Sequence, residues 1–250
     1  MSGHSKWHSI KHKKGAIDAK RGKLFSKLIK EIQVAARMGG GDLDGNPRLR
    51  KSVADAKAAS MTADTIKRAI QRGTGEIEGA TYEEILYEGT GPGGTLFLVE
   101  TMTDNRNRTV AEMRRVFEKH TGQLGASGSA QWAFDRKGII TVAKDAATED
   151  QIMEVAVGAG AQDYSDIGEE WQILCEVPET DTVSGALEAG SIKVSSSSVG
   201  YVPKTKKAIA GRDAEKCLAM FETLDDHDDS QNVYADFDIS DEELARIGQG

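Results

Sequence analysis

The stretch that decides the fold of this chain is residues 1–30, MSGHSKWHSIKHKKGAIDAKRGKLFSKLIK, where a basic arm passes into an amphipathic helix. It contains nine Lys or Arg residues and one acid, Asp18. From Lys20 onward, apolar residues recur at the i, i+3, i+4 spacing of one helix face. Four lysines, which we call the lysine stripe, recur on another face: Lys20, Lys23, Lys27 and Lys30. The sequence therefore predicts one helix with a core on one side and cations on the other.

Charge divides the chain into two unlike parts. Residues 1–72 contain 17 Lys or Arg and 6 Asp or Glu, whereas the remainder contains 15 and 34, which gives the net charge of −8. This asymmetry is typical of a polyanion-binding module on an acidic body. The alternative interpretation is that the charges only form solvated surfaces.

Composition indicates a globular protein without a membrane segment. Hydrophobic residues make up 38% of the 250 positions, and the longest apolar runs, such as 96–99, are far shorter than the roughly 20 residues of a membrane span. The N-terminus has no apolar signal-peptide core. Cys175 and Cys217 lie in apolar patterns without metal-binding spacing. We therefore expect a cytoplasmic protein with reduced core thiols and no membrane partner.

Periodicity predicts a helical module followed by mixed α and β units. Helices are expected from Pro47 to about Ser60 and, with Thr62 as N-cap, up to Gly73. Further strands are expected at 82–89, 94–103, 138–143, 169–177, 194–203 and 232–239, and further helices at 107–119, 148–161, 180–190 and 212–226. If the last helix and strand complete the first sheet, the unit at about 138–203 is an insertion. The tail from Asp241 is predicted to be peripheral.

Six blocks of sequence resemble successive motifs of the YebC/PmpR family. They are 2–32 (SGHSKWHSIKHKKGAIDAKRGKLFSKLIKEI), 39–50 (GGGDLDGNPRLR), 65–75 (TIKRAIQRGTG), 87–94 (YEGTGPGG), 103–109 (TDNRNRT) and 122–134 (GQLGASGSAQWAF). The resemblance implies an α+β multidomain fold: a three-helix domain (1–79), an α+β domain (80–136 with 208–240) and a ferredoxin-like domain inserted into it (137–207). It also implies a regulator of gene expression. Bacterial members are described as probable DNA-binding transcriptional regulators, others as acting with the ribosome, and a mitochondrial relative activates translation of cytochrome c oxidase subunit I.

Basic residues of the N-terminal module are the predicted nucleic-acid contacts, because Lys and Arg neutralise phosphates and release counterions. The segment is mostly Lys, which favours backbone affinity over base reading. Trp7 either stacks on an exposed base or anchors the terminus to the core. The predicted contacts are Lys6, Trp7, Lys11, Lys13, Lys14, Lys20, Arg21, Lys23, Lys27, Lys30, Arg48, Arg50, Lys51, Lys67, Arg68 and Arg72.

Other motifs point to less chemistry. Asn105, Arg106 and Arg108 lie at a strand-to-helix junction and form a candidate anion site, with helix capping by Asn107 or Thr109 as the alternative. GTGPGG at 89–94 is interpreted as a turn, because it has neither the Lys nor the spacing of a phosphate loop. The spacing of His4, His8 and His12 suits a metal, but neighbouring lysines would repel it, and no metal or cofactor is predicted.

Nothing in the sequence resembles a catalytic constellation, so we expect no catalytic residue and no enzyme. The leading hypothesis is a non-enzymatic, DNA-binding transcriptional regulator that acts through the lysine-rich helical module. The alternative is a translation factor that binds ribosomal or transfer RNA. The expected partners are nucleic acid with the transcription machinery or the ribosome, and no small-molecule substrate is evident.

Overall fold

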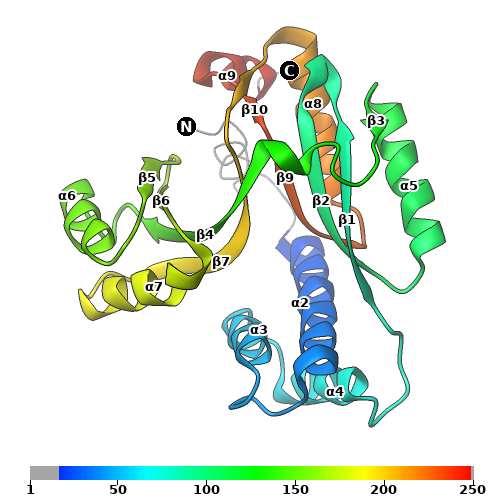
Figure 1. Cartoon of the computed structure of the whole chain (residues 1–250), viewed down its shortest axis with the longest axis vertical. Helices are drawn as coiled ribbons and strands as arrows, with labels where there is room; N and C mark the ends of the chain where they lie inside the picture. The colour runs from blue at the N-terminus through cyan, green and yellow to red at the C-terminus, as the bar shows by residue number, and fades with distance from the viewer. Residues whose placement is uncertain (1–16, 249–250) are drawn as a thin grey trace.

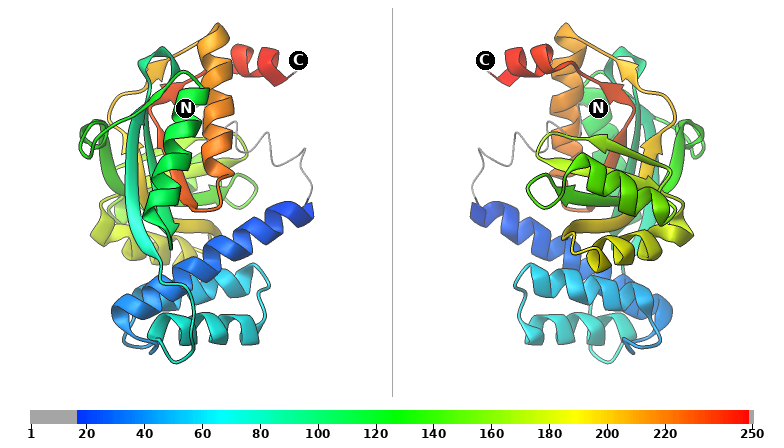
Figure 2. Two further views of the ribbon diagram at one scale, coloured as in Figure 1. Left: turned by 90° about the vertical axis from the view of Figure 1, so that its right-hand side faces the viewer. Right: turned by 90° about the vertical axis from the view of Figure 1, so that its left-hand side faces the viewer.

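The computed structural model describes the backbone of residues 17–248 and the side chains of residues 21–248. Its first part, here called the helical module, contains α2 (Ile17–Gly39), α3 (Pro47–Ala58) and α4 (Ala63–Thr74). Asn46 caps α3 by accepting the Leu49 N–H at 3.0 Å, and Thr62 caps α4 as predicted. In Figures 1 and 2, α2 lies between the body of the protein and α3 with α4.

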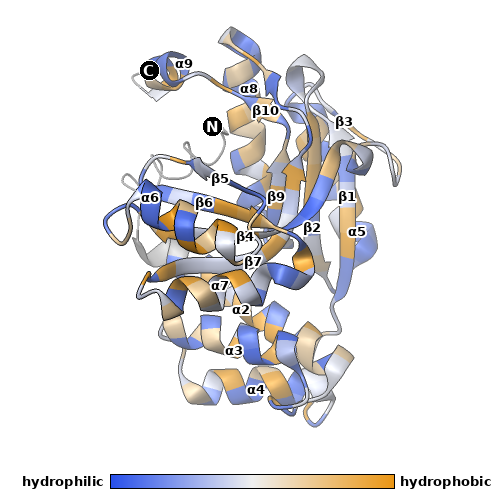
Figure 3. Cartoon of the chain, turned by 60° about the vertical axis from the view of Figure 1, so that its left-hand side comes forward, coloured by the Kyte–Doolittle hydropathy of each residue, from blue (hydrophilic) through white to orange (hydrophobic). Residues whose placement is uncertain are grey.

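The helical module has its own apolar core. The predicted face of α2 supplies fully buried Ile32 and Ala36, which pack with Leu49 of α3 and Ala69 of α4. Figure 3 shows the same division as alternating polar and apolar colour along the three helices. Helix α4 ends one residue later than predicted, at Thr74, because Gly75 adopts the left-handed conformation (φ 81°) that closes a helix.

The first sheet has the strand order β3-β1-β2-β9. Its strands are β1 (Glu83–Thr90), β2 (Leu96–Thr103), β3 (Gln123–Leu124) and β9 (Ser230–Ala235). Helices α5 (Arg106–Lys119) and α8 (Gly211–Asp225) cover one face, and their apolar side chains form a core with Phe97. The GTGPGG stretch is a turn, as predicted, with a short 3-10 segment (Pro92–Gly94) between β1 and β2.

The second sheet has the order β5-β6-β4-β7, with antiparallel neighbours throughout. Its elements are β4 (Phe134–Ala143), α6 (Glu149–Ile152), β5 (Asp163–Asp166), β6 (Glu170–Cys175), α7 (Thr180–Ala189) and β7 (Val194–Pro203). This β-α-β-β-α-β succession is the ferredoxin-like arrangement that the family resemblance implies. The helix expected at 148–161 starts with the predicted capping box at Thr148 but widens into a π-helical turn at Met153–Val157.

Strand β9 pairs with β2 of the first sheet, although the whole second sheet lies between them in the sequence. This is the topology that an inserted unit produces. Short strands β8 (Lys207–Ala208) and β10 (Phe237–Asp238) pair beside it. Strand β8 was not predicted, and the strand expected at 232–239 is divided into β9 and β10. Two separate apolar clusters, one under each sheet, account for the buried free thiols of Cys217 and Cys175. Burial raises the pKa of the Cys217 thiol to about 11.

The prediction of a peripheral tail was wrong. Residues Asp241–Gly248 form α9, and its Leu244 is only 2% exposed within the core beside α8. Glu243 accepts the Gly211 N–H, and Arg246 pairs with Glu215 at 2.8 Å. The single leucine among acidic residues gave too weak a periodic signal to indicate this docking.

The glycine- and serine-rich stretch at 122–134 is held by one buried carboxylate. Glu88 of β1 accepts the backbone N–H groups of Gly128, Ala130 and Gln131 at 2.6–2.7 Å. Burial alone would raise the pKa of this carboxyl, but the three hydrogen bonds outweigh burial and lower it. The stretch is therefore a positioned loop between the two sheets. Over the described residues, no helix combines the length and apolar character that a membrane span requires.

Candidate nucleic-acid interface

Part of the predicted interface lies outside the described residues. This applies to Lys6, Trp7, Lys11, Lys13 and Lys14 and to the side chain of Lys20. The histidines that were considered as metal ligands, His4, His8 and His12, also lie outside the described residues. Arg21 is described and exposed, and its guanidinium lies over the Phe25 ring, 5.3 Å from the ring centroid. The remaining predicted contacts fall into three groups that the sequence could not distinguish.

The first group is the lysine stripe, whose described members face the body of the protein. They contact residues 225–229, here called the acidic loop, which connects α8 to β9. Lys23 Nζ lies 2.9 Å from Asp226 Oδ1, Lys27 Nζ 3.2 Å from Asp225 Oδ1, and Lys30 Nζ 2.8 Å from Asp229 Oδ1. The spacing of three to four residues places one lysine per helical turn against the loop. These three ammonium groups are therefore engaged within the molecule.

Asp229 is the centre of this contact. Its side chain is 4% exposed, and its Oδ2 atom accepts hydrogen bonds from Arg108 at 2.8 Å and Thr109 at 2.7 Å, while Oδ1 accepts from Lys30. Burial would raise the pKa of the carboxyl, but the donors from Lys30, Arg108 and Thr109 outweigh burial and hold the pKa well below its usual range. Asp229 is thus an ionised buried group that links the helical module to α5.

Protein carboxylates already occupy most of the candidate anion site at the start of α5. Arg108 pairs with Asp104 at 3.1 Å as well as with Asp229, so its guanidinium already faces two carboxylates. The cap is Asn105, whose side chain accepts the Arg108 N–H at 3.1 Å, and not Asn107 or Thr109 as expected, because Thr109 turns inward to Asp229. Arg106 is exposed.

The second group forms ion pairs or backbone contacts within the helical module and its border. Arg48 binds Glu31 at 2.7 Å and Glu84 of β1 at 2.6 Å, and these hydrogen bonds raise the pKa of its guanidinium. Arg50 donates to the carbonyl oxygens of Leu43 and Asp44. Lys51 and Arg68 form exposed i,i+4 pairs, which stabilise little and leave both cations accessible.

Apart from Arg21, the third group consists of the exposed cations of the helical module whose side chains have neither a carboxylate within 4 Å nor a hydrogen bond in the described part of the chain. We call them the outer cations: Arg37, Lys57, Lys67 and Arg72. Lys67 and Arg72 were predicted as contacts, whereas Arg37 and Lys57 were missed. Arg37 continues the period of the stripe seven residues after Lys30, and this spacing could have identified it.

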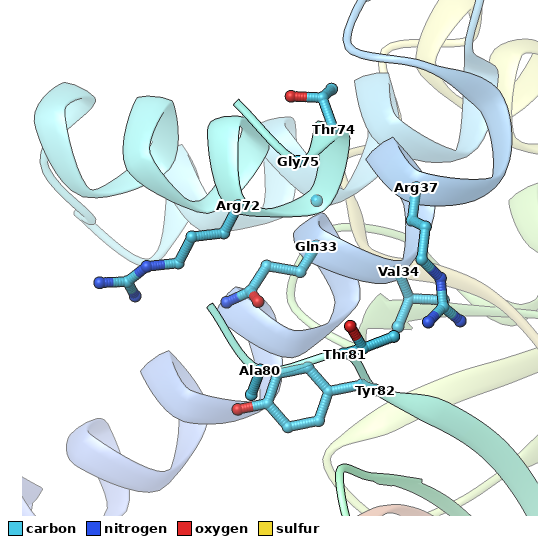
Figure 4. Close-up of a pocket in the computed structure, with 10 residues that line it drawn as sticks. Gln33, Val34, Arg37, Arg72, Thr74, Gly75, Ala80, Thr81 and Tyr82 are labelled. Atoms are coloured by element: carbon cyan, nitrogen blue, oxygen red, sulfur yellow. The ribbon is translucent and has the colours of Figure 1, made fainter. Parts of the chain in front are cut away.

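Two outer cations border a hollow of about 290 Å³. The hollow lies between the end of α4, the facing part of α2 and the connector that leads to β1 (Figure 4). Its lining residues are Gln33, Val34, Arg37, Arg72, Gly73, Thr74, Gly75, Ala80, Thr81 and Tyr82. Burial is the main cause of a raised pKa at the Tyr82 hydroxyl, so this group is neutral at physiological pH.

Within the described residues, Glu112, His227 and Asp229 are the three acidic or histidine groups close enough to suggest a metal site, with ligand atoms within 4.8 Å of one another. His227 Nε2 lies 3.1 Å from Glu112, and its Nδ1 faces the Asp229 N–H. Because both Asp229 oxygens already accept hydrogen bonds from protein groups, these contacts form an ion-pair network, and we assign no metal to it.

Fold and site define a three-part α+β protein in which a basic helical module is docked on the acidic loop of the body. Comparison with known proteins identifies its family. Residues 5–76 match the model described as TACO1/YebC protein N-terminal domain, and residues 82–237 match TACO1/YebC second and third domain. The chain belongs to the TACO1/YebC family, which confirms the resemblance predicted from its motifs.

Relatives and a solved structure agree with this assignment. A protein of Desulforapulum autotrophicum is 54% identical over 97% of this chain and 98% of its own. A protein of Geobacter sulfurreducens is 52% identical over 99% of this chain and 100% of its own. Both are named "probable transcriptional regulatory protein". The crystal structure of a conserved hypothetical protein from Aquifex aeolicus, 42% identical, matches with a TM-score of 0.84 over 90% of this chain and 93% of that one.

Proposed function

We propose that this chain is a non-enzymatic, nucleic-acid-binding regulator of gene expression that works in the cytoplasm. The observation that supports the proposal is the set of outer cations on the helical module. An exposed cation without a carboxylate partner contributes most to the affinity for a phosphate. Its new ion pair displaces only water and a counterion condensed on the nucleic acid, and no ion pair within the protein has to break. The names of the relatives support transcription as the process that is regulated.

The proposal revises which residues make the contact. The sequence alone favoured the lysine stripe, but the described stripe lysines are held by the acidic loop. We therefore assign phosphate contact to Arg37, Lys57, Lys67 and Arg72, with the accessible Arg50, Lys51 and Arg68 at their border and the basic arm before residue 17 as a further contributor. In this proposal the domain division stays at 1–79, 80–136 with 208–240, and 137–207.

Ultraviolet crosslinking in cells, followed by sequencing of the DNA and the RNA recovered with the tagged protein, tests the function directly. We expect promoter DNA, and its recovery should fall when Lys57 and Lys67 are replaced by Glu. Enrichment of ribosomal or transfer RNA would make the chain a translation factor instead. Recovery of neither nucleic acid above an untagged control would contradict the proposal.

A further inference from the structure

We infer that the hollow beside α4 binds a single unpaired nucleotide, with the base inside and the phosphates at the rim. The inference rests on the proposed nucleic-acid function and names the form of nucleic acid that this module would recognise. Four features of the hollow carry it: a side-chain amide that has no hydrogen-bond partner in the described part of the chain, an aromatic floor, two guanidinium groups at opposite sides, and a helix C-terminus above.

The amide belongs to Gln33 of α2. The residue is only 6% exposed, yet its side-chain amide has no hydrogen-bond partner among residues 21–248. Figure 4 shows this amide extending over the Tyr82 ring, toward the side on which Arg72 lies. The amide atoms are not among the enclosed polar atoms without a partner, so they open on the hollow, where a ligand can reach them. An amide offers both a donor and an acceptor, which is the pattern that pairs with the edge of a nucleobase.

The aromatic floor is Tyr82, which is half-buried before β1. The Lys30 ammonium lies 5.2 Å from the centroid of its ring, which fixes the ring between α2 and the connector. An aromatic ring held in this way is a stacking surface for a base, and stacking requires a base that is not paired within a duplex.

The charges of the hollow separate base from phosphate. Helix α4 ends above it at Thr74, and the C-terminal end of a helix carries partial negative charge, which disfavours a phosphate in the middle and favours base N–H donors. Arg72 and Arg37 lie on opposite sides of the hollow. The stem of Arg72 packs against Gly79, where an added Cβ would come within 3.0 Å of Cγ, so the connector positions this side chain. The two guanidiniums suit the phosphates that flank one nucleotide.

The size of the hollow agrees with a compact ligand. Its volume of about 290 Å³ is close to the lower end of the roughly 300–1,000 Å³ of small-ligand sites. Val34 and Ala80 are the small apolar members of its lining, so a lipid or other apolar ligand would leave the amide and hydroxyl groups unpaired.

Fluorescence of 2-aminopurine tests the inference on the full chain. The probe is a single strand of about twelve nucleotides with one central 2-aminopurine, used alone and annealed to its complement. Stacking on Tyr82 should quench the unpaired probe on binding. Tyr82→Phe should keep the quenching, whereas Tyr82→Ala should remove it and weaken single-strand binding about tenfold without changing duplex affinity.

Gln33→Met provides a second variant of similar shape that lacks the amide. We expect it to weaken single-strand binding about fivefold and to leave duplex binding unchanged. Arg115→Ala, on the exposed side of α5, is the control for a surface substitution away from the hollow and should change binding of neither probe. Quenching that persists in Tyr82→Ala, or equal losses for single strand and duplex, would overturn the inference.

The two proposals fail in different ways. If Lys57→Gln with Lys67→Gln lowers binding of both probes while the Tyr82 and Gln33 variants change nothing, the nucleic-acid function stands and the nucleotide site is wrong. If the unaltered protein binds neither probe, the nucleic-acid function is contradicted and the site falls with it.

Discussion

The helical module and the second sheet are both attached to the first sheet, but through contacts of opposite chemistry. The helical module is joined by ion pairs: the lysine stripe with the acidic loop, and Arg48 with Glu84. The apolar clusters of the two parts share no residue. The second sheet is joined by apolar packing, in which Phe134 of β4 lies against fully buried Leu98 of β2. The ring centroids of Tyr201 and Tyr234 lie 5.4 Å apart in the same contact.

The attachment of the helical module should therefore be sensitive to salt and acid, whereas neither should weaken the attachment of the second sheet. Salt weakens exposed ion pairs and protonation of the carboxylate weakens any ion pair, whereas salt does not weaken the burial of apolar surface and protonation leaves it unchanged. The helical module is therefore the part of the chain whose docking the environment can change, and it is also the part that contains the proposed nucleic-acid surface.

Removing the central carboxylate should have the largest effect on stability. Asp229→Asn leaves Lys30 (12% exposed) and Arg108 without their buried counter-charge, and breaking a buried pair in this way costs about 3–5 kcal/mol. Urea unfolding followed by circular dichroism measures the loss. Asp55→Asn, which breaks the exposed pair with Lys51, is the control and should cost less than about 1 kcal/mol. Equal effects of the two variants would contradict the central position of Asp229.

A cavity in the apolar contact should have a similar or slightly smaller effect. Leu98→Ala removes a fully buried side chain between the two sheets and should cost about 3 kcal/mol. The cost should be the same at low and high salt, whereas the smaller cost of Asp226→Asn, which breaks the exposed pair with Lys23, should shrink as salt rises. Unfolding curves at two salt concentrations make the comparison, and an equal salt response of both variants would show that the two contacts do not differ in kind.

Acid should weaken the ionic contact selectively. The pKa of Asp229 is lower in the folded protein than in the unfolded chain, so the unfolded chain binds more protons, and stability falls as pH decreases below the ordinary carboxyl range of about 4. The unaltered protein should lose more stability between neutral pH and about pH 3 than Asp229→Asn does. Parallel pH curves would contradict this assignment.

Much of the fold could be predicted from sequence because its signals are local. The apolar face of α2, the cap at Thr62 and the turn at GTGPGG each depend on a few neighbouring residues. The sequence could not decide whether β9 returns to the first sheet, because strand pairing across a long insertion has no local signal. The docking of α9 through Leu244 was missed because one apolar residue among acids does not establish a period.

The candidate site was harder, because pairing between distant charges decides which cations are available. Lys23 and Lys67 look alike in sequence, yet Lys23 pairs with Asp226, which lies 203 residues further along the chain. Nothing in the composition of the run from Asp225 to Asp229 shows that it faces α2. Gln33 and Tyr82 were absent from the predicted site, since an amide and a phenol acquire meaning only when the fold places them beside the same hollow.

The salt dependence of nucleic-acid binding tests the central claim most directly. The slope of log affinity against log salt counts the phosphates that a protein neutralises. Replacing Arg37, Lys57, Lys67 and Arg72 together by Gln should reduce the magnitude of this slope by about 3–4. Replacing Arg114 and Arg115 of α5 by Gln is the control and should leave the slope unchanged. An unchanged slope in the first variant would contradict the assignment of the outer cations as the nucleic-acid surface.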